Sequence, residues 1–136
     1  MKKGLLTIAL GVNLFALQVL GTSPSRGLTL DEAEQLARMA LAPSVRDYPQ
    51  MKFDLSNETD SPEFYTFEIT AAVPDNASPV LAHFSVNRSN GDVWEAVGCF
   101  KVKSPDLRKL QQTLRRKINL SNADAKLLGK KAPCQP

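Results

Sequence analysis

Histidine and cysteine are scarce in this sequence, and their scarcity limits the chemistry that the chain can perform. One histidine and two cysteines occur among 136 residues. A metal site usually needs more than one strong ligand, and a catalytic triad needs a nucleophile and an acid beside its histidine. The cysteines lack the CxxC spacing of redox motifs. Because no catalytic motif is present either, the sequence predicts a protein that is not an enzyme and holds no metal or cofactor.

The chain is also short, and it lacks internal repeats and low-complexity segments. Its length excludes two full domains, a receptor-sized helical bundle and a dinucleotide-binding enzyme with a separate substrate domain. The content of 43% hydrophobic and 23% charged residues is that of one ordinary globular domain. We therefore expect a single domain over residues 29–136.

Residues 1–21 have the pattern of a secretory signal peptide. Lys2 and Lys3 precede an uncharged apolar stretch, and small residues stand at the −3 and −1 positions of a cut after Gly21. The alternative is that the segment is not cleaved and anchors the chain in a membrane. Only in that case do we expect contact with a membrane through this segment. We expect cleavage, a flexible leader over residues 22–28, and a periplasmic or secreted product.

Export favours pairing of the two cysteines, because oxidising compartments allow disulfides to persist. A bond between Cys99 and Cys134 would close a loop of about 36 residues and stabilise the fold by roughly 3–4 kcal/mol. Two free thiols are the alternative.

Hydrophobic periodicity and capping signals predict an α+β fold. It has an N-terminal helix, a four-stranded antiparallel meander, and a C-terminal helix followed by a short helix. Capping boxes begin the first and last helices, at residues 29–32 and 121–124. The expected helices span residues 30–41, 105–118 and 122–128, and the expected strands span residues 51–55, 63–73, 80–87 and 92–100.

The last two strands allow a prediction of register. A four-residue loop from Arg88 to Gly91, with Gly91 left-handed, pairs Val86 with Val93 and Ala82 with Val97. The same register places two further side chains, His83 and Trp94, together on the other face. Glu95 then stands among apolar residues, for which the pattern gives no reason.

Residues 29–95 resemble the PepSY-like family of small exported domains. The resemblance rests on the run LDEAEQLA from Leu30 to Ala37, which leads into strands, and on the hairpin FSVNRSNGDV from Phe84 to Val93. Asn87 replaces the usual aspartate, and the basic C-terminal helices and Cys134 lie outside the family pattern. The resemblance implies a non-catalytic module that inhibits a peptidase or binds another protein.

Two groups of residues are candidates for contact with a partner. Trp94 and His83 would form an amphipathic sheet face, unless helices cover that face and bury the tryptophan. Arg108, Arg115 and Arg116 lie in a basic segment, residues 101–131, with ten basic and two acidic residues and a net charge of +8. A solvated helix face, partly neutralised by the net −7 of residues 22–100, is the plainer interpretation of this charge.

These observations lead to one predicted function and one alternative. The chain is expected to bind an envelope or extracellular protein, as an inhibitor of a periplasmic or extracellular hydrolase. The alternative is that the basic helix binds an anionic surface such as phospholipid or lipopolysaccharide. Nucleic acid is excluded, because the protein is expected to be exported and its basic segment lacks interleaved aromatic residues. Four Asn-x-Ser/Thr sequons begin at Asn57, Asn76, Asn87 and Asn119. Whether they carry glycans depends on the source organism.

Overall fold

The computed structural model describes residues 26–56, 61–73 and 79–134. The predicted signal peptide over residues 1–21, and the leader as far as residue 25, lie outside these residues. None of the helices in the described ranges is long and apolar enough to cross a membrane. The elements in chain order are α1 (Leu30–Ala40), the 3-10 helix η1 (Pro43–Val45), β1 (Lys52–Leu55), β2 (Phe64–Thr70), β3 (Val80–Asn87), β4 (Val93–Glu95), β5 (Phe100–Lys101), α2 (Pro105–Lys117) and α3 (Asn122–Leu128).

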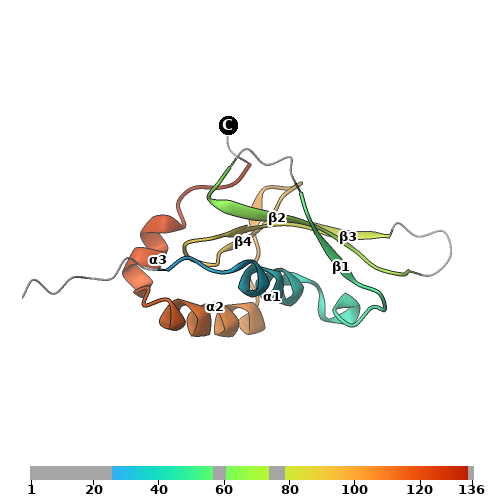
Figure 1. The fold of residues 1–136 in the computed structure, drawn as a ribbon, viewed down its shortest axis with the longest axis horizontal. Helices are drawn as coiled ribbons and strands as arrows, with labels where there is room; N and C mark the ends of the chain where they lie inside the picture. The colour runs from blue at the N-terminus through green and yellow to red at the C-terminus, as the bar shows by residue number, and fades with distance from the viewer. Residues whose placement is uncertain (1–25, 57–60, 74–78, 135–136) are drawn as a thin grey trace, which may run out of the picture.

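The five strands form one antiparallel sheet in the order β1-β2-β3-β4-β5, with helices α1 and α2 on one face (Figure 1). The predicted α+β class is therefore confirmed. The number of strands is a correction, because the single strand expected over residues 92–100 is divided into β4 and β5.

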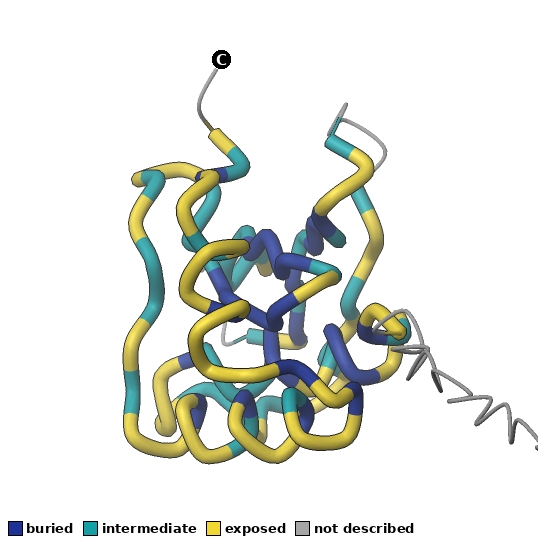
Figure 2. The backbone as a smooth tube through the Cα atoms, turned by 90° about the vertical axis from the view of Figure 1, so that its left-hand side faces the viewer, coloured by how far each residue is buried: buried dark blue, intermediate teal, exposed yellow. Residues whose placement is uncertain are grey.

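The main core lies between the helices and this face of the sheet (Figure 2). Leu36 and Ala37 of α1 are fully buried, as is Leu107 of α2. The sheet contributes residues at alternate positions, which point to the same side. These residues are Phe67, Ile69, Phe84, Val86 and Val93. The sequence left open which face the helices cover, and the structure leaves His83 and Trp94 on the opposite face.

Each α-helix begins at the cap residue that the sequence predicts. Thr29 accepts a hydrogen bond from the Glu32 N–H, and the Glu32 carboxylate accepts one from the Thr29 N–H in return. The Ser104 and Ser121 hydroxyls accept a hydrogen bond from the N–H of the third residue of α2 and α3, respectively. The predicted capping box at α3 is incomplete, because the Asp124 carboxylate bonds to the Ser121 hydroxyl and not to its N–H. Side-chain acceptors satisfy backbone donors that the helix itself leaves unpaired, so these starts are encoded locally.

Glu32 also joins α1 to α2, because its carboxylate lies 2.6 Å from the Lys117 ammonium. The hydrogen bond from Lys117, followed by that from the Thr29 N–H, lowers the pKa of Glu32 below its ordinary value, although burial opposes the shift. Because the pKa of Glu32 is lower in the folded protein than in the unfolded chain, its ionised carboxylate stabilises the fold at pH values above the unfolded-state pKa. This stabilisation is lost as the pH falls through the folded-state pKa.

We therefore expect Glu32→Gln to lower the free energy of unfolding at pH 7 by about 1–2 kcal/mol. The difference from the parent protein should shrink in acid, where Glu32 of the parent is itself protonated. Urea unfolding between pH 7 and pH 3 measures both effects. Glu34→Gln on the same helix is the control, because Glu34 is 42% exposed and its contact with Arg38 is 3.9 Å long. A constant difference at every pH would contradict the role assigned to the Glu32 charge.

The β3–β4 hairpin has the predicted register at its loop end. Val86 pairs with Val93, and Gly91 has a left-handed φ of 73°. The predicted pair of Ala82 with Val97 is wrong, because the last pair of this ladder is Phe84 with Glu95, and Val97 is 80% exposed.

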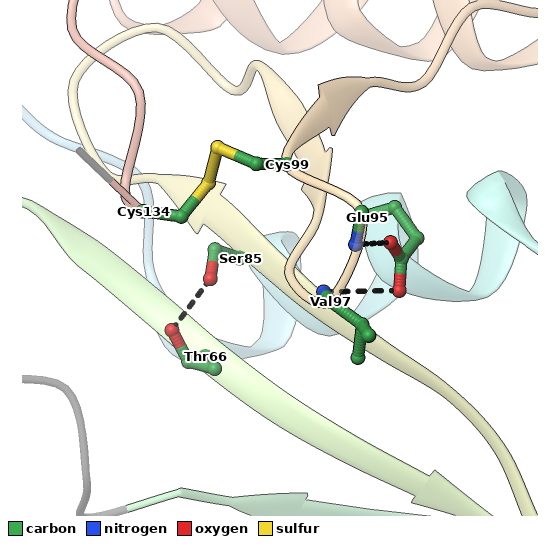
Figure 3. The surroundings of a disulfide bond; sticks show 7 residues. Thr66, Ser85, Glu95, Val97, Cys99 and Cys134 are labelled. Carbon is green, nitrogen blue, oxygen red and sulfur yellow. Dashed lines mark hydrogen bonds between the residues drawn. A yellow bond between two sulfur atoms is a disulfide. The ribbon is translucent and has the colours of Figure 1, made fainter.

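Glu95 is the residue that ends β4. Its carboxylate accepts hydrogen bonds from the backbone N–H groups of Val97 and Gly98 and so closes a turn (Figure 3). Cys99 follows with a φ of 54°. The chain then returns as β5. The hydrogen bonds to this turn explain why a glutamate stands among apolar residues at position 95, which the alternation of the strand does not.

The predicted disulfide between Cys99 and Cys134 is present, with the two Cα atoms 5.9 Å apart. The segment after α3 passes to the side of the sheet opposite α1 and α2 (Figure 1). There the bond lies near a hydrogen bond of 2.8 Å between the buried Thr66 and Ser85 hydroxyls (Figure 3). The disulfide therefore fastens the C-terminal segment to the second face of the sheet.

Candidate functional site

His83 and Trp94, predicted to contact a partner, lie on the sheet face that carries the disulfide. The His83 Nδ1 is 4.0 Å from a Glu68 carboxylate oxygen, and the imidazole side chain is 38% exposed. Ser85, two residues further along β3, shares its hydrogen bond with Thr66. A nucleophile and its base need to be within hydrogen-bond reach of each other. Here the serine hydroxyl is engaged by another side chain.

Trp94 is half-buried and makes a cation–π contact. The Lys101 ammonium lies 5.2 Å from the ring centroid. The indole Nε1 is buried and has no hydrogen-bond partner within the described part of the chain. Trp94 pairs across the strands with Ser85, which lies near the disulfide (Figure 3). This face therefore presents less open aromatic surface than the sequence pattern suggested.

Possible metal ligands do not gather in the described residues. No group of three or more histidine, cysteine, aspartate or glutamate side chains is close enough there to hold an ion.

Arg115, a further predicted contact residue, is engaged inside the molecule. Its Nε donates to the Asn90 carbonyl at 2.7 Å, and its Nη2 lies 3.0 Å from the Asp92 carboxylate. Its side chain is 17% exposed. The guanidinium therefore fastens α2 to the β3–β4 hairpin loop, and we do not place Arg115 on a binding surface.

The hairpin loop is the centre of a buried polar network that also receives α3. The amide of Asn90 donates to Asp92 and to the Ala125 carbonyl of α3. Gln111 of α2 donates to the Gly91 carbonyl at 2.9 Å. The sequence predicted the turn but not the network, although a loop rich in asparagine and aspartate followed by a basic helix was a visible signal.

The asparagines of the four Asn-x-Ser/Thr sequons differ in their exposure where the structure describes them. Asn87 is 4% exposed, and its side-chain oxygen accepts hydrogen bonds from the Ser89 and Asn90 N–H groups, so its amide is a buried part of the turn. Asn119 is exposed, while Asn57 and Asn76 lie outside the described residues.

The remaining two predicted contact residues, Arg108 and Arg116, are exposed on the side of α2 that faces away from the sheet. They are eight positions apart with Gln112 midway, which places all three along one side of a helix. Lys109 is exposed beside them. None of these three cations forms an ion pair with another described residue. Because Trp94 and His83 lie on the far side of the sheet, one flat partner surface cannot contact both predicted groups.

Two apolar pockets lie elsewhere on the described surface. One of about 410 Å³ lies between the end of α1 with η1 and strands β3 and β5, and the 57% exposed Phe100 is among its lining residues. The other, of about 310 Å³, lies at the junction of α2 and α3. Leu127 and Leu128 line this second pocket and are 62% and 43% exposed. Neither pocket could be predicted from the sequence, because each depends on how elements pack.

Comparison with known proteins gives one informative similarity. No family model matches the chain, and no curated protein matches it. The chain is similar to a solved chain described as part of the structure of a type VI secretion system effector–immunity complex from Pseudomonas protegens. The two are 29% identical with a TM-score of 0.60, and the match covers 81% of this chain and 92% of that chain. This similarity is consistent with a non-catalytic, inhibitor-like interaction module.

Proposed function

We propose that this chain is an immunity-type protein that binds a toxic effector and blocks its activity. The observation that carries the proposal is the similarity, over most of both chains, to a component of an effector–immunity complex. The effector would be the periplasmic or extracellular hydrolase that the sequence led us to expect as the partner. The signal-peptide pattern of residues 1–21 and the Cys99–Cys134 disulfide support a site of action in the periplasm.

Side-chain geometry favours the inhibitory component of such a pair over the toxic one. A toxic enzyme would need reactive groups aimed at a substrate. Here the Ser85 hydroxyl is bound to Thr66, and the Asp92 carboxylate is bound to Lys101 and Arg115. These polar groups hold elements of the fold together.

The candidate effector for the test is the protein encoded by the gene adjacent to the gene of this chain. The two are produced together in the periplasm of a bacterial host, and growth is compared with that of cells making the effector alone. We expect growth to recover to the level seen with a catalytically inactive effector, and the purified proteins to elute as one complex in size-exclusion chromatography. If the host still dies and the two proteins elute separately, the proposed function is wrong.

A further inference from the structure

We propose that the outer side of α2 and the adjoining α3 form the partner-binding surface, and that the partner presents an acidic protein surface with an apolar side chain at its centre. This inference rests on the proposed immunity function and specifies which face acts. The α2–α3 surface consists of the exposed residues Arg108, Lys109, Arg116, Lys126, Leu127 and Leu128, with the pocket that α3 forms with Asn119 and Leu120.

Charge is the first argument for this surface. Four cations of the basic C-terminal segment form ion pairs within the molecule. Lys101 and Arg115 bind Asp92, Lys117 binds Glu32, and Lys131 binds Glu63.

The other cations of the segment form no ion pair with a described residue, and they are Lys103, Arg108, Lys109, Arg116, Lys126 and Lys130. The two acidic residues of the segment are Asp106, which contacts Arg46, and Asp124, which bonds to Ser121. Such a surface attracts and orients an acidic partner.

Exposed leucines beside these cations are the second argument. In α3, Ala125 alone is buried, whereas Leu127 and Leu128 are exposed. Leu127 and Leu128 line the pocket of about 310 Å³ together with Asn119, Leu120 and Asp124. An apolar pocket within a polar rim is the usual arrangement of an energetic centre in a protein interface.

The two features meet at the end of α2. The Asn119 N–H donates to the Arg116 carbonyl and the Leu120 N–H to the Arg115 carbonyl, so a tight turn joins the end of α2 to α3. Arg116 therefore lies about one helical turn from pocket residue Asn119. The larger pocket near Phe100 has no basic residue in its lining, and its one charged lining residue, Glu95, is bound to the backbone of its own turn. The smaller pocket likewise has one charged lining residue, the acidic Asp124, but it adjoins the exposed Arg116 at the end of α2.

The experiment measures the affinity of variants for the protein encoded beside this chain. Arg108→Glu and Arg116→Glu should each weaken binding about tenfold, with the loss concentrated in the association rate and reduced at high salt. Leu127→Asp places a charge at the apolar centre and should weaken binding at least about thirtyfold. Thermal unfolding should stay close to that of the parent, because these side chains are exposed.

Two variants serve as matched controls. Lys52→Glu makes the same charge change at an exposed position on β1, and Phe100→Ala removes an exposed apolar residue at the other pocket. Both should bind like the parent. If Arg116→Glu and Leu127→Asp bind like Lys52→Glu while the parent binds tightly, the α2–α3 surface is wrong and the immunity function stands. If the parent itself fails to bind, the proposed function fails first.

Vesicles containing phosphatidylglycerol distinguish an anionic membrane from an acidic protein. We expect the parent to show little binding to them at physiological salt. Tight binding to the vesicles that Arg116→Glu abolishes, with no change in affinity for the neighbouring protein, would assign the surface to the membrane and overturn the proposal.

Discussion

Replacing Asp92 with alanine should lower the free energy of unfolding by about 3 kcal/mol, because the change leaves Lys101 and Arg115, two partly buried cations, without their counterion. The Asp92 carboxylate lies 2.8 Å from the Lys101 ammonium and 3.0 Å from the Arg115 guanidinium. It also accepts a hydrogen bond from the Asn90 amide. The Asp92 side chain is 11% exposed, and that of Arg115 is 17% exposed. Urea denaturation followed by circular dichroism measures this loss.

Close packing around the carboxylate adds to the expected effect. Gly129, the C-cap of α3, lies so near Asp92 that a Cβ at this position would clash with the carboxylate. The Gly129 carbonyl also accepts a hydrogen bond from Lys101 at 3.2 Å. Loss of Asp92 should therefore loosen α3 together with the hairpin loop, and hydrogen exchange at Ala125 should accelerate more than exchange in β2.

Asp106→Ala is the matched control for this prediction. Asp106 also faces an arginine, Arg46, but at 3.5 Å and with 58% of its side chain exposed. Exposed pairs of this kind contribute less than about 1 kcal/mol. Equal destabilisation by the two substitutions would contradict the structural role of the Asp92 network.

Loss of the disulfide is the second change with a large expected effect. Replacing both Cys99 and Cys134 with alanine should lower the free energy of unfolding by about 3–4 kcal/mol, because the bond restricts the unfolded chain over a loop of this length. In the folded protein the bond fastens the segment that contains the buried Ala132. The measurement is the urea midpoint of the variant against that of the oxidised parent.

Reductant provides the control for the cysteine variant. It should destabilise the parent by a similar amount and leave the double-alanine variant unchanged. The intact mass of the parent should rise by two hydrogens on reduction. Parent protein whose unfolding midpoint is insensitive to reductant would show that the bond contributes nothing to stability.

The sequence by itself determined the features that depend on neighbours along the chain. Thr29, Ser104 and Ser121 begin helices because each supplies a side-chain acceptor to nearby N–H groups. The alternation of β3 and β4 and the glycine at position 91 defined a hairpin whose register at Val86 and Val93 the structure confirms. Two cysteines behind a predicted export signal were sufficient to predict their pairing.

Only the tertiary structure decided which side chains are available to a partner. Arg115 and Arg116 are adjacent and chemically identical, yet the first binds Asn90 and Asp92 while the second is exposed. The physical reason is that a helix points successive residues in directions about 100° apart, so the packing of α2 against the hairpin divides its cations between the interior and the surface. Charge along the chain therefore revealed a basic segment, and only packing showed which of its cations remain free to face a partner.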